Sequence, residues 1–337
     1  TALPDQILVG FDNGAVWRWQ LPLSLSALQP NSGAAPSKLK GQLFKKLESD
    51  DNCDRIVKLL SGELLAVCGP MQMQRWDAAS GDTKAKVTAH YGAIHGVLRL
   101  ASGQILSWSD EHTLKLWDAA LERCLLTLRG HSAKVLGALE LSDGRLVSYG
   151  ADRHIRIWQL PELDSSSDIT VPKERQFTPR ETRHRGPPDG VCVLKNGTVI
   201  SWSGADGNIL FWDAQTGECT GRLGLHGSRT TSRLVSPELF GIKGLRLLSS
   251  GELLSFAYDG LRLWDLGSKT CVATSGKSCD GVILIEPDGI IAWDRGEKEL
   301  RLLDTRLSPI IKLAAHSDNV TGALLLPDRT LLSYSED

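Results

Sequence analysis

The sequence predicts an all-β fold built from repeated, four-stranded antiparallel units, and three observations support this prediction. Segments that close with Trp recur at intervals of about 40 to 57 residues, and the clearest copies end at Asp118, Asp213 and Asp265. Two short apolar runs precede each closing Trp, and these runs are too short for helices but suit strands. Asp-Gly and Asn-Gly pairs, which hairpin turns prefer, lie between apolar runs.

The four strands of a unit can be followed in order along the chain. An alternating run at 135–141 predicts a first strand, and runs at 145–149 and 155–158 predict the second and third. The run at 124–128, which follows Trp117, predicts the fourth strand of the preceding unit. One such sheet cannot bury both of its faces, so its stability requires packing against neighbouring units.

The closing position defines a column that runs through the whole chain. Its members are Trp19, Trp76, Trp117, Trp158, Trp212, Trp264 and, in place of a seventh Trp, Leu303. A unit of this length with a Trp-Asp ending is typical of a propeller blade, and the sequence resembles the WD40 repeat family over essentially its whole length. The resemblance implies a WD40-type β-propeller. Seven blades are favoured, with strands from both chain ends in the last blade, and an eight-bladed ring is the alternative.

The repeat predicts a single propeller domain over residues 1–337. The longer intervals predict insertions at about 22–40, 161–173 and 227–242. Because the chain starts without Met and stops within a repeat, we expect a fragment of a larger protein with flanking domains.

Composition narrows the function without naming it. The chain is 41% hydrophobic and 23% charged, as in ordinary globular proteins, and its net charge of −2 gives no support for bulk attraction to polyanions. No apolar run reaches the length of a membrane span, so no membrane association is predicted. Seven cysteines without paired spacing favour buried free thiols and a cytoplasmic location.

Ser, His and acidic residues recur together and imitate a hydrolase triad. Two of these sets, each with its closing Trp, are His131, Ser148, Asp152, Trp158 and His184, Ser201, Asp206, Trp212. Similar sets occur around Trp117, with His90, Ser107 and Glu111, and around Trp264, with His226, Ser255 and Asp259. A catalytic site would occur once, so the repetition favours a structural role. The family resemblance implies hydrogen bonds among these four residues, and no catalytic residue is predicted.

Two units depart from this pattern. The second has Ser49, Ala66 and Pro70 near the His, Ser and turn positions, and the seventh has Ala292 and Leu303 for Ser and Trp. We expect packing to hold these two blades together.

Other motifs predict neither a cofactor nor a metal. Gly276-Lys277-Ser278 lacks the first Gly of a phosphate-binding loop, and the acidic run 50–54 lacks the Gly of a calcium loop. The basic stretch 173–185 contains acidic residues too and offers only Phe177 as an aromatic platform, so nucleic-acid binding there is an unfavoured alternative.

The family resemblance directs attention to the face that carries the loops into the first strands and the turns between second and third strands. The repeat register places ten candidate partner-binding residues there: Asp54, His95, Asp110, Lys134, Leu136, Asp189, Lys243, Tyr258, Asp280 and Thr321. Acids outnumber bases among the residues expected on this face, which would suit a protein or peptide partner with basic residues.

We therefore expect a non-catalytic scaffold or sensor module that binds a protein or peptide on this face. The alternatives are a ligand-binding or enzymatic propeller that uses a central channel, and the nucleic-acid binder already mentioned. Gly137, Gly190, Gly244, Gly281 and Gly322 share one first-strand position, which we interpret as close packing around the axis.

Overall fold

The computed structural model is all-β, as predicted, and its strands follow the repeat of the sequence. It describes residues 2–3, 7–12, 15–20, 42–46, 53–160, 174–176, 184–224, 241–285, 289–314, 316–325 and 331–335. Side chains are described from residue 53 onward, except at 54, 174–176, 314 and 332. The chain divides into two compact units, one of Thr1–Asp152 with Ile157–Glu174 and one of Arg153–Arg156 with Arg175–Asp337. The single domain over 1–337 stays a prediction.

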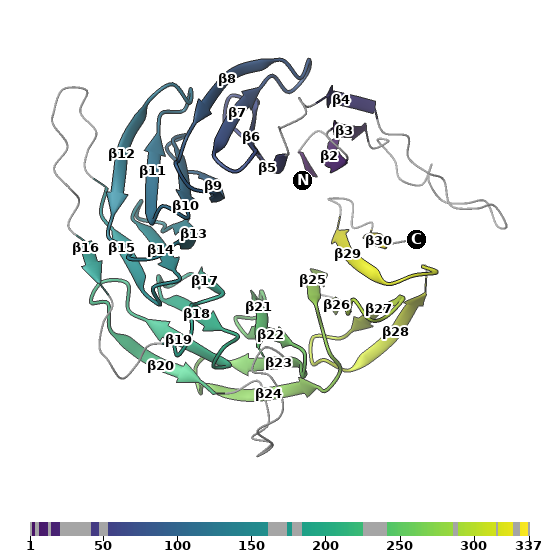
Figure 1. The fold of residues 1–337 in the computed structure, drawn as a ribbon. Coiled ribbons are helices and arrows are strands. Elements are labelled where there is room, and N and C mark those ends of the chain that lie inside the picture. Colours follow the sequence, from purple (N-terminus) through teal and green to yellow (C-terminus); the bar gives the residue numbers. More distant parts are fainter. Residues whose placement is uncertain are drawn as a thin grey trace. The chain divides into compact units, whose positions relative to one another are not determined.

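The first half of the chain forms four antiparallel sheets of four strands each (Figure 1). Their strands are β1 (Ala2–Leu3), β2 (Ile7–Asp12), β3 (Ala15–Gln20), β4 (Gln42–Lys46); β5 (Cys53–Lys58), β6 (Leu64–Cys68), β7 (Gln72–Trp76), β8 (Thr83–Thr88); β9 (Ile94–Arg99), β10 (Ile105–Ser109), β11 (Thr113–Trp117), β12 (Cys124–Arg129); and β13 (Val135–Glu140), β14 (Leu146–Gly150), β15 (Ile155–Trp158), β16 (Glu174–Gln176).

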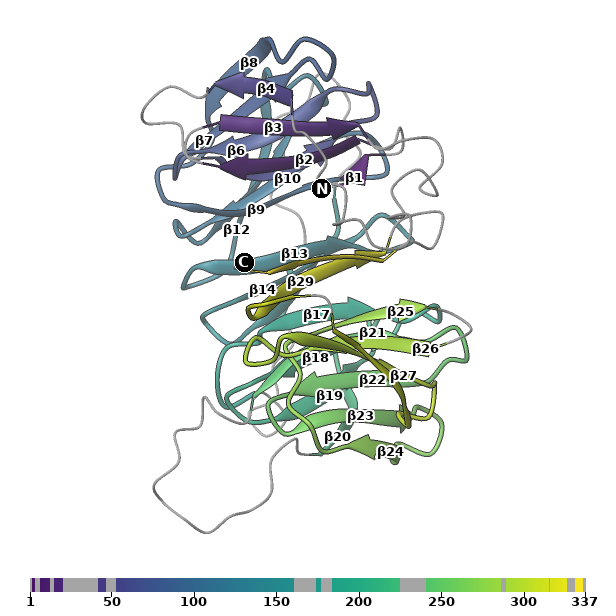
Figure 2. The ribbon, with the colours of Figure 1, turned by 90° about the vertical axis from the view of Figure 1, so that its right-hand side faces the viewer.

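The second half forms three further four-stranded sheets and one hairpin. Their strands are β17 (Gly190–Val193), β18 (Val199–Ser203), β19 (Asn208–Trp212), β20 (Cys219–Leu223); β21 (Ile242–Leu247), β22 (Leu253–Ala257), β23 (Gly260–Asp265), β24 (Thr270–Ser275); β25 (Gly281–Ile285), β26 (Gly289–Trp293), β27 (Glu299–Leu303), β28 (Pro309–Ala314); and β29 (Val320–Leu325), β30 (Leu331–Ser335). Figure 2 shows the strands β21 to β24 side by side in their sheet.

The described residues thus contain seven four-stranded sheets, in agreement with the predicted blades. Two details differ from the prediction. Among the described strands, β29 and β30 pair only with each other and β1 to β4 form a sheet of their own, so none of the described sheets combines strands from both chain ends. Ile242 is the buried first residue of β21, so the predicted insertion at 227–242 does not extend to its last residue. The insertions at 22–40 and 161–173, and residues 227–240, lie outside the described residues.

The core lies between the faces of successive sheets. The second strands are the most buried, and every residue of β6, β10 and β22 is buried. The closing Trp117 packs against residues of the preceding sheet, among them Leu65 and Met73. Trp264 packs in the same way against Ile200 and Phe211. These two sheets therefore bury a face that they could not protect alone, as the repeat predicts.

The shared glycine of the first strand has a specific local cause. Gly96 lies opposite Trp108 on the neighbouring strand, and a Cβ atom on Gly96 would lie 2.2 Å from the Trp108 ring. Equivalent pairs are Gly137 with Tyr149, Gly190 with Trp202, Gly244 with Phe256, Gly281 with Trp293, and Gly322 with Tyr334. The aromatic ring of the second strand lies over the bare backbone of the first. This contact, rather than packing around an axis, accounts for the glycine within each sheet.

Candidate interaction site

The sheet β9–β12 shows how each polar set is connected. The Trp117 indole N–H donates to Ser107 Oγ over 2.9 Å, and His90 Nε2 lies 2.7 Å from the same oxygen. His90 Nδ1 lies 2.7 Å from the Glu111 carboxylate. Burial lowers the pKa of His90, although Glu111 opposes this shift. A neutral imidazole fits the geometry: Ser107 donates to Nε2, and Nδ1–H donates to Glu111.

The Glu111 carboxylate, at the end of this chain of hydrogen bonds, accepts hydrogen bonds from several donors. Burial by itself would raise the pKa of Glu111, but donors around it reverse the shift. The Thr113 hydroxyl, the Tyr91 amide, His90 and Lys115 together lower that pKa to about 2. Glu111 is therefore ionised at neutral pH and fixes the loop before β9 to the turn after β10.

The two predicted sets have the same geometry. Ser148 Oγ accepts from Trp158 and contacts His131 Nε2, both at 2.8 Å, and Asp152 lies 2.9 Å from His131 Nδ1. In the next sheet, these contacts join the four residues Trp212, Ser201, His184 and Asp206, with distances of 2.8 to 3.1 Å for the closest pairs. The fourth predicted set is only partly described: Trp264 donates to Ser255, Asp259 pairs with Arg262, and His226 lies outside the described residues.

Burial separates these sets from a hydrolase site. Ser107, Ser148 and Ser201 are each 0% exposed, so no substrate can reach the hydroxyl oxygen. The indole N–H already occupies that oxygen as a donor. The geometry of a catalytic triad requires an accessible nucleophile, and these side chains instead connect strands inside the sheet.

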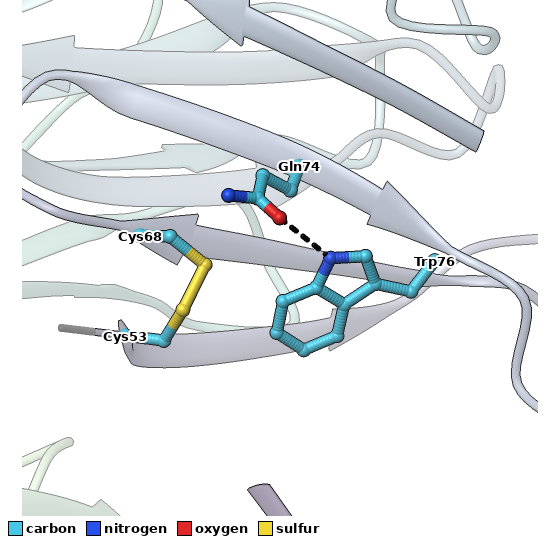
Figure 3. The surroundings of a disulfide bond; sticks show 4 residues. All are labelled: Cys53, Cys68, Gln74 and Trp76. Carbon is cyan, nitrogen blue, oxygen red and sulfur yellow. Dashed lines mark hydrogen bonds between the residues drawn. A yellow bond between two sulfur atoms is a disulfide. The ribbon is translucent and has the colours of Figure 1, made fainter. Parts of the chain in front are cut away.

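The sheet β5–β8 replaces the missing set with two other contacts (Figure 3). The Trp76 indole N–H donates to Gln74 Oε1 over 2.9 Å, and Gln74 is 2% exposed. A disulfide joins Cys53 on β5 to Cys68, the residue opposite on β6. Besides the apolar packing expected for this blade, a cross-strand covalent bond and a buried amide also stabilise it.

The seventh sheet, β25–β28, does rely on apolar contacts. Ala292 and Leu303, which replace Ser and Trp, are buried in a cluster with Leu254 and Leu263 of the preceding sheet. Because the Leu303 side chain has no N–H, unlike a Trp indole, no hydroxyl acceptor is required beside it.

The cysteine prediction needs correction. Cys53 and Cys68 are bonded rather than free. Of the free thiols, Cys279 alone is buried, and burial raises its pKa to about 12. Cys192 and Cys219 are half-buried, whereas Cys124 and Cys271 are exposed on outer strands. The sequence did not show the bonded pair, because its two cysteines belong to one hairpin and not to equivalent positions of different blades.

Half of the predicted partner-binding residues lie in the first unit. His95 Nε2 is 2.6 Å from Asp110 Oδ1, so these two predicted residues contact each other. Lys134 is exposed and Leu136 half-buried. Asp54 lies on β5, and its side chain is outside the described part of the structure.

The other predicted residues lie in the second unit, and four of them share one hollow. This hollow has a volume of about 740 Å³ and is lined by Asp189, Gly204, Ala205, Gly241, Ile242, Lys243, Tyr258, Asp280 and Arg295. Thr321, which bonds the Tyr334 carbonyl over 3.2 Å, does not line it. The structure therefore gathers four residues predicted from the repeat register, and they come from three successive sheets: Asp189, Lys243, Tyr258 and Asp280.

The charges of the hollow are balanced rather than acidic. Its lining has two carboxylates, Asp189 and Asp280, and two cations, Lys243 and Arg295. The Lys243 ammonium pairs with Asp280 and lies 3.2 Å from the centre of the Tyr258 ring. The Arg295 amide donates to Asp280 over 2.7 Å. The excess of acids predicted for the whole face is absent from this hollow.

Arg295 is the functional candidate that the sequence interpretation missed. It lies three residues after Ala292, just as Asp110 and Tyr258 lie three residues after the Ser of their sheets. The register of each turn was set from the Ser of the second strand. The sheet β25–β28 has Ala292 at that position, so the turn that contains Arg295 was not aligned with the others.

Metal and membrane features add nothing to this site. Within the described ranges, no group of three or more His, Cys, Asp or Glu side chains could hold a metal ion. The same part of the chain has no helix that is long and apolar enough to cross a membrane.

Comparison with known proteins agrees with the architecture. The WD40 family, described as WD domain, G-beta repeat, matches residues 122–159, which contain the strands β12 to β15. The crystal structure of the computationally designed Ika8 protein has a TM-score of 0.69 to this chain at 17% identity, covering 99% of this chain and 92% of that chain. At this identity the likeness concerns the fold alone. A comparison with curated proteins finds no match. The described sheets thus repeat the four-stranded unit of a β-propeller, and the WD40 family model recognises one such repeat at residues 122–159.

Proposed function

We propose that this protein is a non-catalytic interaction module that binds a protein or peptide partner through the loop-bearing face of its second unit. WD40 repeats generally mediate protein–protein interaction, and the hollow supports this face as the place of contact. The single observation that carries the proposal is the gathering of Asp189, Lys243, Tyr258 and Asp280, all predicted from the repeat register, in one hollow.

The alternatives have less support. The repeated Ser, His and acidic sets are buried, so they do not supply an enzymatic propeller with a nucleophile. In the basic stretch 173–185, Glu174–Gln176 form strand β16 and His184 is bonded within its sheet, which reduces the part that could hold a nucleic acid. A cytoplasmic location and flanking domains stay predictions, and the Cys53–Cys68 disulfide counts against the first of them.

Site-specific photo-crosslinking tests the proposed face. A photoreactive amino acid replaces Tyr258, and in a control protein it replaces Val272 on β24; the two side chains are equally accessible at 46% and 45% exposed. In lysate from the source organism, we expect products at Tyr258 that an excess of unmodified protein removes, and none of these at Val272. The same products at both positions, or products that resist competition, would refute the proposal.

A further inference from the structure

The hollow of the second unit has a defined order of charges. Asp189 comes from the loop before β17, Lys243 and Tyr258 come from the sheet β21–β24, and Asp280 and Arg295 come from the sheet β25–β28. Shared core clusters place these three sheets in succession: one joins the sheets of β17 and β21, and another joins the sheets of β21 and β25. The lining therefore leads from Asp189 at one end, through a middle sheet, to Arg295 at the other.

The middle of the hollow is neutral and fixed. Lys243 and Asp280 form an ion pair in which each side chain is mostly buried. Lys243 also contacts the face of the Tyr258 ring, and Asp280 also accepts the Arg295 amide. These contacts leave the Tyr258 ring, which is almost half exposed, as an apolar surface for a ligand.

The two ends carry opposite charges with few partners of their own. Asp189 is exposed, and among the described residues its carboxylate accepts only the Gly204 amide N–H. Arg295 is also exposed, and its guanidinium has no hydrogen-bond partner in the described part of the chain. Each end can therefore still bind one ligand group of opposite charge.

We infer that the hollow binds an extended peptide segment that carries one basic and one acidic side chain. The basic side chain pairs with Asp189, the intervening residues cross the Tyr258 ring, and the carboxylate forms a bidentate pair with Arg295. A segment of a single charge sign would meet a group of like charge at one end. The hollow therefore favours peptides that carry both charges, in one order along the chain. This inference rests on the proposed function and specifies the chemistry of its partner.

Selection from a library of random peptides displayed on phage tests the inference without a known partner. We expect enriched sequences with a basic and an acidic residue in one constant order along the peptide. In Asp189→Asn, which keeps an oxygen for the Gly204 amide, enrichment of the basic residue should disappear. In Arg295→Gln, enrichment of the acidic residue should disappear.

Binding of one synthesised enriched peptide gives the magnitude. Each substitution should weaken its affinity by about tenfold, the size expected for one hydrogen bond to a charged group. Glu218→Gln and Arg222→Gln, at exposed positions of the sheet β17–β20, serve as matched charge controls and should leave the affinity unchanged. The double charge exchange Asp189→Arg with Arg295→Asp should favour the peptide with the reversed order.

Enriched peptides of one charge sign, no enrichment at all, or equal effects of the control substitutions would overturn the inference. These results can be separated from failure of the proposed function. Specific crosslinking at Tyr258 combined with any of them would support the interaction face and reject the two-charge ligand.

Discussion

The sheets β9–β12 and β5–β8 are neighbours in the chain and use different residues to bond a buried Trp and to link their first two strands. Both bury a closing Trp whose indole N–H requires an acceptor. In β9–β12 the acceptor is Ser107, which also joins the second strand to His90 ahead of the first. In β5–β8 the acceptor is Gln74, two residues before Trp76 on the same strand, and the link between first and second strands is a disulfide.

The difference shows which part of the repeat is required by the fold. An acceptor for the Trp indole and a link between the first two strands are present in both sheets, whereas the residues that supply them vary. Because one hydroxyl serves both purposes in β9–β12, its loss affects two buried groups at once. In β5–β8 the two purposes are separated, so each can be removed alone.

The largest effect is expected from Ser107→Ala. The substitution removes the acceptor of Trp117 and the partner of His90, and each buried group left unpaired costs about 1–3 kcal/mol, or about 2–6 kcal/mol together. Urea unfolding followed by Trp fluorescence measures the change in the free energy of unfolding. Ser102→Ala, at an exposed turn of the same sheet, is the control, and an equal cost at both positions would contradict the comparison.

Removal of the disulfide is the second prediction. The bond closes a loop with a sequence separation of 15, for which the loss is about 3 kcal/mol. We expect a reductant to lower the unfolding free energy of the wild type but not of a Cys53→Ala, Cys68→Ala double variant.

Thiol counting supplies an independent check on the same bond. Under denaturing, non-reducing conditions, alkylation should label five of the seven cysteines. Labelling of all seven would show that β5–β8 lacks the covalent link.

The sequence was sufficient for the features that repeat. The Trp column, the strand order and the sets around His131 and His184 agree with the structure, because each of these patterns recurs in the sequence at similar spacing. The glycine column was seen but misinterpreted, since its partner is an aromatic residue that changes among Trp, Tyr and Phe on the neighbouring strand.

Features that occur once were not predictable in this way. The Cys53–Cys68 bond depends on the cross-strand register of one hairpin, and the Gln74–Trp76 hydrogen bond joins two side chains of one strand. No second copy in the sequence reveals either contact. Arg295 was missed because the Ser that fixes the register is Ala292 in its sheet. The balanced charges of the hollow required side-chain pairing, since the sequence shows the number of acids but not which cation neutralises each.

The third prediction tests whether the two solutions are interchangeable. Gln74→Leu should cost about 1–3 kcal/mol because Trp76 loses its acceptor. Ala66 precedes Trp76 by ten residues, the same separation as Ser107 from Trp117. Addition of Ala66→Ser to the Gln74→Leu variant should therefore restore part of the unfolding free energy. A second substitution that only adds to the loss would show that β5–β8 cannot accept the hydroxyl.

The smallest effect concerns pH and belongs to β9–β12, since no acid is predicted at the turn position of β5–β8, where Pro70 lies. The pKa of Glu111 is lowered from an ordinary value of 4.5 to about 2. A depressed carboxyl pKa stabilises the fold above the unfolded-state value, and this contribution is lost as pH falls from 4.5 toward about 2. Glu111→Gln keeps one acceptor oxygen and should cost about 1 kcal/mol at neutral pH, where a charged acceptor is replaced by a neutral one. Unfolding free energies of the two proteins, measured across this window, should converge toward its acid end. A constant difference at every pH would mean that the Glu111 charge contributes nothing and that the hydrogen bonds of β9–β12 act through geometry alone.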